Sequence, residues 1–332
     1  MKPLRVLSLF DGISCGQVAL ERAGIPIEVY YASEIDKYAI QIAQKNYPNT
    51  IQLGDVTKID FTQYIGKIDL IMGGSPCQDL SIAGKRKGLQ GERSGLFYKF
   101  VEAIEVIKPK YFLLENNVGM PQDAYEEISN LMGCYPIEIN SALVSAQTRK
   151  RYYWTNIGNK NYNLFGFPTV AIPQPKNKGI LLKDVLESGL VDTDKSFCIT
   201  QRYNGQFGSP EYTLKRNFDM SMGQIVAEPL QLGHISNTNA QANRVYSVHN
   251  KSVTLKANGG GGGAKTGLYK IDLPDGEYLI RKLTPIECER LQTLPDNYTE
   301  GVSNTQRYKA IGNGWTVDVI AHIFSFLKAE EE

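Results

Sequence analysis

The sequence predicts an α/β protein with a doubly wound, mixed sheet and a smaller, irregular β-rich domain. Up to residue 165, short β-rich runs alternate with helix-length segments, which is the pattern of βαβ units. Beyond that point the chain is rich in proline, glycine and asparagine, and helical periodicity returns only at Thr284. We therefore expect one domain over residues 1–165, a second over 166–280, and a segment 281–332 that returns to the first.

The first domain has five expected strands and three expected helices. The strands are short apolar runs bounded by turn residues, and the helices are longer segments with apolar residues at helical spacing. The expected strands are Leu4–Phe10, Glu28–Ser33, Asp69–Gly73, Tyr111–Glu115 and Tyr152–Ile157. The expected helices are Gln17–Ala23, Lys37–Asn46 and Leu96–Ile107.

The later part of the chain contains fewer regular elements. Strands are expected at Ser252–Leu255 and Leu268–Ile271, on either side of a glycine run. Helices are expected at Thr284–Leu294 and Val317–Leu327. Pro285 suits the first position of a helix, and Glu287 and Glu289 place acidic side chains in its early turns.

Composition narrows the class of protein. A length of 332 residues with 42% hydrophobic residues is typical of a globular chain with a real core. The five cysteines include no close C-x-x-C pair and the three histidines are far apart, so we expect neither a disulfide framework nor a metal site. No apolar run reaches the roughly 20 residues that cross a bilayer, and none follows Met1. We therefore expect a cytoplasmic protein without membrane contact.

The net charge of +1 gives no general attraction to a polyanion. A nucleic-acid partner would have to be held by local clusters such as Lys85-Arg86-Lys87. Most such clusters are simply solvated surface.

The first strand leads into the glycine-containing turn Phe10–Gly16, where an α/β sheet admits nucleotide-like ligands. A tight connection to the next helix would explain this turn equally well. The second strand ends at Glu34, which can accept the hydroxyl hydrogens of a ribose. Asp55 offers a carboxylate for an adenine amino group, although a surface turn residue is an equal alternative. Because no phosphate-binding lysine motif accompanies them, an adenosine with a sulfonium fits better than NAD or ATP, and the Phe10 ring suits such a cation.

Cys77 follows a buried-type strand and the segment Gly73-Gly74-Ser75-Pro76, so it is expected at the carboxyl edge of the sheet. An isolated cysteine is more often a small buried hydrophobe. The next strand, however, ends in Glu115-Asn116, which brings a carboxyl group to the same edge. A nucleophilic role for Cys77 depends on having this carboxyl group nearby.

Five motifs occur in a set order along nearly the whole chain. They are Pro76-Cys77-Gln78, Glu115-Asn116, Gln147-x-Arg149-x-Arg151, Arg281-Lys282-Leu283-Thr284-Pro285 and Gly312-Asn313. This ordered set resembles that of the DNA cytosine-5 methyltransferases. The resemblance implies the Rossmann-like fold of S-adenosylmethionine-dependent methyltransferases. It also implies methyl transfer from S-adenosyl-L-methionine to C5 of a cytosine flipped out of duplex DNA.

The resemblance implies a role for each catalytic residue. Cys77 would add to C6 of the cytosine, which requires a thiolate and hence a pKa below the usual value of about 8.5. Glu115 would bind N3 and the exocyclic amine, and Arg151 would hold O2. Arg149 belongs to the same motif and is counted with the catalytic residues.

The resemblance also implies the ligand contacts. The cofactor residues would be Phe10, Asp11, Gly12, Ile13, Gly16, Glu34, Ile35, Asp55, Val56, Ser75, Pro76, Leu96, Asn313 and Trp315. The segment after residue 240 resembles the target-recognition region of a small bacterial family member, and the loop after Cys77 closes over DNA in the family. The DNA contacts would be Ser81, Lys85, Gln241, Arg244, Thr254, Gly260 and Gly261. Arginine can form two parallel hydrogen bonds with a guanine base. Alternatively, these residues would be turn residues of a small β domain.

Two other functions remain open on the sequence. One branch of the family methylates cytosine in transfer RNA with the same catalytic groups, although the sizeable region from 166 to 280 favours DNA. The other is a catalytically inactive regulator that binds DNA, against which the intact Cys77, Glu115 and Arg151 argue. We expect a monomer of prokaryotic or phage origin, with a cognate restriction endonuclease as a conceivable partner.

Overall fold

The computed structural model describes residues 1–75, 96–164, 166–187 and 283–327, together with the backbone of four strands between 231 and 281. The chain divides into two compact units. The first consists of Met1–Asn140, Lys150–Pro175 and Val317–Glu332, and the second of Ser141–Arg149 and Lys176–Thr316.

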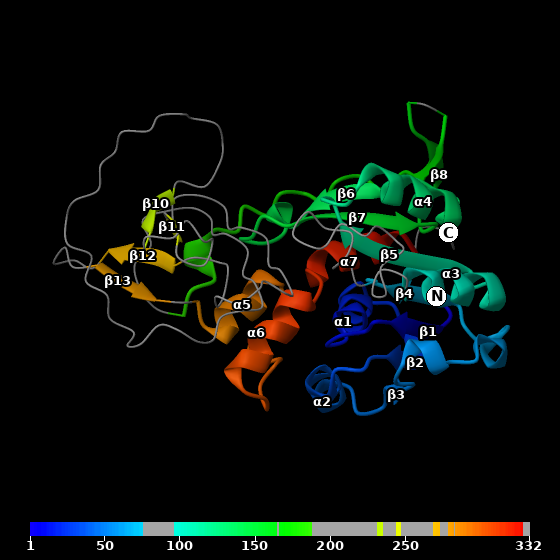
Figure 1. Ribbon diagram of the computed structural model, residues 1–332, viewed down its shortest axis with the longest axis horizontal. Coiled ribbons are helices and arrows are strands. Elements are labelled where there is room, and N and C mark those ends of the chain that lie inside the picture. Colours follow the sequence, from blue (N-terminus) through cyan, green and yellow to red (C-terminus); the bar gives the residue numbers. More distant parts are fainter. Residues whose placement is uncertain are drawn as a thin grey trace. The chain divides into compact units, whose positions relative to one another are not determined.

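The first unit is built on a seven-stranded sheet with the order β3-β2-β1-β4-β5-β7-β6 (Figure 1). The strands are β1 Leu4–Leu9, β2 Ile27–Ser33, β3 Ile51–Gln52, β4 Leu70–Gly73, β5 Tyr111–Asn117, β6 Ile137–Asn140 and β7 Lys150–Thr155. Strands β1 to β5 are parallel, whereas β7 runs antiparallel to both β5 and β6. The predicted doubly wound, mixed sheet is confirmed. The short strand β3 and the edge strand β6 were not predicted, and β7 begins two residues before the expected Tyr152.

Helices α1 Cys15–Arg22, α2 Lys37–Asn46, α3 Phe97–Ile107 and α4 Gln122–Met132 belong to this unit. The first three begin and end within two residues of their predicted ranges, and α4 was not predicted. Apolar side chains of α3 and α4 share one core cluster with alternate residues of the central strands, among them Leu7, Ile71 and Leu114. Helix α1 packs against α7 Val317–Phe324. Alternation along the strands thus supplies an apolar face for each helical layer.

The strand order reverses at β1, which pairs with β2 on one side and β4 on the other. In doubly wound sheets, ligands bind outside the carboxyl ends of the strands at such a reversal. Gly73, the last residue of β4, is required here, because a Cβ at this position would lie 2.6 Å from the Leu9 carbonyl oxygen. The glycine therefore lets β1 and β4 remain paired up to the edge where the candidate site lies.

The second unit contains α5 Pro285–Leu291 and α6 Asn304–Asn313. As predicted, α5 begins with Pro285. The structure adds a capping box, formed by Thr284 and Glu287. The helix ends three residues before the expected Leu294, and α6 was not predicted. The predicted segment 281–332 is divided between the units, because α5 and α6 belong to the second and α7 to the first.

A four-stranded sheet in this unit has the order β10-β11-β12-β13. Its strands are β10 Gln231–His234, β11 Arg244–Tyr246, β12 Leu268–Asp272 and β13 Tyr278–Arg281. The strand expected at Leu268–Ile271 is β12, whereas Ser252–Leu255 lies outside the described residues. A hairpin of β8 Lys160–Tyr162 and β9 Pro168–Val170 completes the first unit's strands.

Candidate active site

The turn after β1 has an unusual backbone. Phe10 and Ser14 both have a φ of 58°, and Gly12 has a φ of 61°. Bulky residues rarely adopt this left-handed region, and such conformations cluster at functional sites. The turn is held by hydrogen bonds from the Asp11 N–H to the Ser33 carbonyl, at 3.0 Å, and from the Gly12 N–H to the Glu34 carboxylate, at 2.8 Å. Both hydrogen bonds tie the turn to the end of β2.

Asp11 fastens this turn through its side chain. Its carboxylate accepts hydrogen bonds from the Tyr30 hydroxyl at 2.7 Å and from the Ser14 hydroxyl at 2.5 Å. Burial raises the pKa of Asp11, and these hydrogen bonds oppose that shift. The side chain of Asp11 therefore supports the turn, and a contact with a cofactor would come from its backbone.

Glu34 lies at the carboxyl end of β2, half-buried beside the turn. One carboxylate oxygen accepts the N–H groups of Ile35 and Asp36, each at 2.8 Å, and the other accepts that of Gly12. The Ile35 side chain next to it is 76% exposed, which is unusual for an isoleucine and leaves an apolar surface beside a carboxylate. A carboxylate and an exposed apolar side chain therefore stand next to each other at the end of β2.

Asp55 lies further along this edge, beyond β3, where it caps a short 3₁₀ turn. It accepts hydrogen bonds from the Thr57 N–H at 2.9 Å and the Thr57 hydroxyl at 2.8 Å. The backbone hydrogen bond lowers the pKa of Asp55, so its carboxylate stays ionised at neutral pH. Among the other predicted cofactor residues, the Ile13 and Val56 side chains are buried in the core, so only their backbones could reach a ligand.

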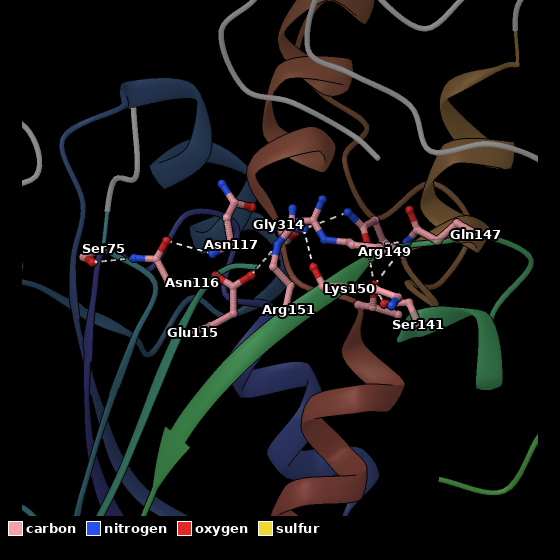
Figure 2. Close-up of polar contacts among 12 residues, drawn as sticks. Ser75, Glu115, Asn116, Asn117, Ser141, Gln147, Arg149, Lys150, Arg151 and Gly314 are labelled. Atoms are coloured by element: carbon pink, nitrogen blue, oxygen red, sulfur yellow. Dashed lines mark hydrogen bonds and ion pairs between the residues drawn. The ribbon is translucent and has the colours of Figure 1, made fainter. Parts of the chain in front are cut away.

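Glu115 and Arg151 form a buried ion pair at the same edge, as Figure 2 shows. Arg151 pairs with Asn117 across β5 and β7, and Glu115 pairs with Tyr153, so the Glu115 and Arg151 side chains are diagonal neighbours on one face. The Arg151 Nε lies 2.8 Å from the Glu115 Oε1, and the two side chains are 7% and 11% exposed. Burying two charged groups in this way costs free energy unless each compensates the other.

Asn116 connects the ends of β4 and β5 (Figure 2). Its Nδ2 donates to the Ser75 hydroxyl at 3.3 Å, and both side chains are buried. Pro76 and Cys77 follow Ser75 directly in the chain and lie outside the described residues. Leu96, where the description resumes, is half-buried against the core.

Three further predicted residues, Arg149, Asn313 and Trp315, belong to the second unit. The Arg149 guanidinium is 4% exposed and donates to the Gly314 carbonyl at 3.0 Å. Asn313, the last residue of α6, is exposed, and Trp315 is half-buried. The two arginines of one motif therefore have different partners in the structure. Arg151 pairs with a carboxylate, whereas Arg149 donates to a backbone carbonyl.

Sequence reasoning missed several buried polar residues here. Gln292 and Thr316 are 0% and 1% exposed. Both hydrogen-bond to Gln147, which was noted only as a motif letter. Nothing in the local sequence marks them, since glutamine and threonine are usually surface residues.

Most predicted DNA contacts lie outside the described residues, namely Ser81, Lys85, Gln241, Thr254, Gly260 and Gly261. Arg244 begins β11, of which only the backbone is described. Within the described ranges, histidine, cysteine and acidic side chains form no group of three that could hold a metal ion. None of the helices described is long and apolar enough to span a membrane.

The fold and the site together define an α/β protein with a doubly wound sheet and a buried glutamate–arginine pair at the carboxyl edge of that sheet. Residues 4–329 match the C-5 cytosine-specific DNA methylase family. The chain belongs to this family and is a DNA cytosine-5 methyltransferase.

Curated relatives cover almost the whole chain. The type II methyltransferase M.HhaI of Haemophilus parahaemolyticus is 30% identical over 330 residues, which cover 96% of this chain and 93% of the relative. The orphan methyltransferase M.SPRI of Bacillus phage SPR is 27% identical over 430 residues, with 98% of each chain covered.

Two solved structures share the fold. The Dnmt2 methyltransferase of S. pombe has a TM-score of 0.63 at 18% identity and covers 99% of this chain and 100% of its own. The Entamoeba histolytica methyltransferase EhMeth has a TM-score of 0.64 at 16% identity and covers 100% of both chains. These likenesses confirm the predicted methyltransferase fold.

Proposed function

We propose that this enzyme transfers a methyl group from S-adenosyl-L-methionine to C5 of a flipped-out cytosine in a short duplex DNA site, through a covalent bond between Cys77 and C6. The buried ion pair of Glu115 and Arg151 carries this proposal. The anionic group, Glu115, lies on β5, the neighbour of the strand β4 that leads into the segment before Cys77, and the cationic group, Arg151, lies on β7 beside β5. Membership of the family supplies DNA as the substrate.

In the proposed mechanism the Cys77 thiolate adds to C6 and converts the cytosine ring into an enamine-like nucleophile. Glu115 binds N3 and the exocyclic amine and favours protonation at N3, while Arg151 holds O2. The ion pair supports this role because it holds the carboxylate in a set orientation before the base arrives. Both groups then offset the charge that develops on attack.

S-adenosylmethionine supplies an electrophilic methyl group on a sulfonium. The electron pair at C5 would form the new carbon–carbon bond while the bond from the methyl carbon to the sulfonium sulfur breaks, which would release S-adenosyl-L-homocysteine. A base would then remove the C5 proton. The Cys77–C6 bond then breaks, which releases the thiolate and restores the aromatic ring. Flipping the cytosine out of the duplex costs roughly a few kcal/mol of unstacking and unpairing. The segment that carries Ser81 and Lys85 is proposed to contact the DNA during this step.

The cofactor is proposed to lie against the turn Phe10–Gly12. Glu34 would accept the ribose hydroxyls, the exposed Ile35 would cover the adenine, and Asp55 would take the adenine amino group. Phe10 would face the sulfonium. Asn313 and Trp315 are also proposed as cofactor contacts.

Replacing Glu34 with Gln is expected to raise the Kd for S-adenosylmethionine about 10-fold or more, because hydrogen bonds to charged groups contribute about 1.5–3 kcal/mol. The amide has a single acceptor oxygen, so it keeps either the Gly12 N–H or the Ile35 and Asp36 N–H groups as donors, and the thermal unfolding midpoint is measured alongside to separate lost ribose binding from a disturbed turn. Isothermal titration calorimetry measures the Kd. Glu28→Gln, an exposed carboxylate on the same strand β2, is the matched control and should bind like the wild type. Equal affinity of the Glu34 and Glu28 variants would contradict the ribose assignment.

The wild-type enzyme is expected to transfer tritiated methyl groups from S-adenosylmethionine to duplex DNA and not to transfer RNA. Plasmid DNA from cells that express the protein, sequenced after bisulfite treatment, would reveal the methylated site. Activity on transfer RNA alone would replace the proposed substrate, and absence of both activities would favour a DNA-binding regulator. The proposal also includes that the enzyme is a monomer, acts in the cytoplasm and has a cognate restriction endonuclease as its partner.

A further inference from the structure

The second unit contains a buried polar network made of Gln147, Arg149, Gln292 and Thr316. Their exposed fractions are 0%, 4%, 0% and 1%. Burying four such side chains costs free energy unless each is hydrogen-bonded. A network of this size at a helix end therefore indicates a specific task.

Gln147 is the centre of the network. Its Nε2 donates to the Leu291 carbonyl at 2.6 Å, to the Gln292 Oε1 at 2.7 Å and to the Thr316 hydroxyl at 3.1 Å. The Thr316 hydroxyl in turn donates to the Gln292 Oε1 at 2.9 Å and accepts from the Ser141 hydroxyl at 2.9 Å. Residues more than 140 positions apart in sequence are thereby joined at the end of α5.

The other side of the network holds the end of α6. The Gln292 Nε2 donates to the Ile311 carbonyl at 2.9 Å and to the Gly314 carbonyl at 3.2 Å. Arg149 donates to the same Gly314 carbonyl at 3.0 Å. The last carbonyls of a helix lack partners within the helix, and here glutamine and arginine side chains provide them.

The network fixes the backbone on both sides of the outward-facing residues. Gly314 is held through its carbonyl and Thr316 through its hydroxyl, whereas Asn313 is exposed and Trp315 is half-buried. These last two are the residues proposed to contact the cofactor.

We propose that Arg149 and Thr316 are positioning residues for the segment Asn313–Thr316, and that Arg149 contributes to cofactor affinity instead of touching the cytosine. This proposal rests on the proposed function, because it takes S-adenosylmethionine as the ligand of this segment. The Arg149 contact supports it, since the Arg149 guanidinium donates a hydrogen bond to the Gly314 carbonyl, which lies within this segment.

The test measures the KM for S-adenosylmethionine and kcat at saturating duplex DNA, together with the Kd by calorimetry. Thr316→Val, which removes the hydroxyl and keeps the shape, is expected to raise the KM and Kd for S-adenosylmethionine about 10-fold, or about 1.4 kcal/mol. Its kcat is expected to change less than about 3-fold. Thr316→Ser should restore wild-type values.

Arg149→Met should raise the KM for S-adenosylmethionine without weakening covalent trapping on 5-fluorocytosine DNA, and Arg149→Lys should retain part of the affinity.

Thr50→Val is the matched control, since Thr50 is also a buried threonine, hydrogen-bonded to Gln17 at 3.0 Å. It should leave the KM unchanged. An unchanged KM in Thr316→Val would overturn the proposal, and so would an Arg149→Met enzyme that loses trapping on DNA while its KM for S-adenosylmethionine stays the same. If Arg149→Met does not fold, the two Thr316 variants decide. A wild-type protein that binds no S-adenosylmethionine defeats the proposed function itself.

Discussion

Replacing Cys77 with Ser is expected to lower kcat for methyl transfer to DNA by about 10,000-fold or more, as losses of catalytic nucleophiles do. A serine hydroxyl is not ionised at neutral pH, and none of the predicted catalytic residues is a histidine that could act as its general base. Without a nucleophile at C6, C5 of cytosine stays too weak to attack the methyl group. Tritiated methyl transfer under single-turnover conditions measures the loss.

Cys134→Ser is the matched control for this experiment. Cys134 is buried, its thiol lies 3.6 Å from the Thr155 carbonyl, and burial raises the pKa of this thiol to about 11, which makes it a poor nucleophile. The control should retain near wild-type turnover. The Cys77 variant should still bind S-adenosylmethionine but form no covalent complex with 5-fluorocytosine DNA. Turnover within a few-fold of the wild type would contradict the covalent mechanism.

Replacing Glu115 with Gln is expected to lower kcat about 100- to 1,000-fold, the usual effect of losing one group that stabilises developing charge. The amide cannot favour protonation at N3. It also leaves the Arg151 guanidinium buried without its carboxylate, and breaking a buried ion pair costs about 3–5 kcal/mol of folding free energy. Activity and the thermal unfolding midpoint are both measured, so that loss of catalysis is separated from loss of fold.

Glu138→Gln controls for the removal of a carboxylate from the same sheet. Glu138 lies on β6 and pairs with Lys150 at 3.2 Å, with both side chains well exposed. Exposed ion pairs contribute little to stability, so this variant should keep both its unfolding midpoint and its turnover. If Glu115→Gln behaves like Glu138→Gln, Glu115 does not assist attack at C6.

Much of the catalytic edge could be predicted from sequence because parallel strands end at one edge whatever covers their faces. Glu34, Ser75 and Glu115 each follow an apolar run, and each lies at that edge in the structure. The short strand β3 escaped prediction because two residues carry no periodicity. Helix α6 escaped because its sequence is mostly polar and its apolar positions are few.

For some polar residues the local sequence indicates the wrong degree of burial and the wrong partners. Glu289 reads as an acidic residue near the start of a helix, where it would favour the helix dipole from the surface. In the structure it is fully buried and accepts hydrogen bonds from the N–H groups of Asn297 and Thr299 and from the Arg307 guanidinium. Its partners come from a later loop and helix, which no pattern around Glu289 reveals.

The sequence by itself determined the family, the doubly wound sheet and the edge at which Glu115 and the segment leading to Cys77 are found, because the alternation of strands with helices and the order of the motifs are written along the chain. Only the tertiary structure decided how Arg149 and Arg151 differ. Arg151 meets a carboxylate on the neighbouring strand, whereas Arg149 meets a carbonyl 165 residues away in sequence. A guanidinium is the same donor in both places, so the partner that folding brings to it sets its role.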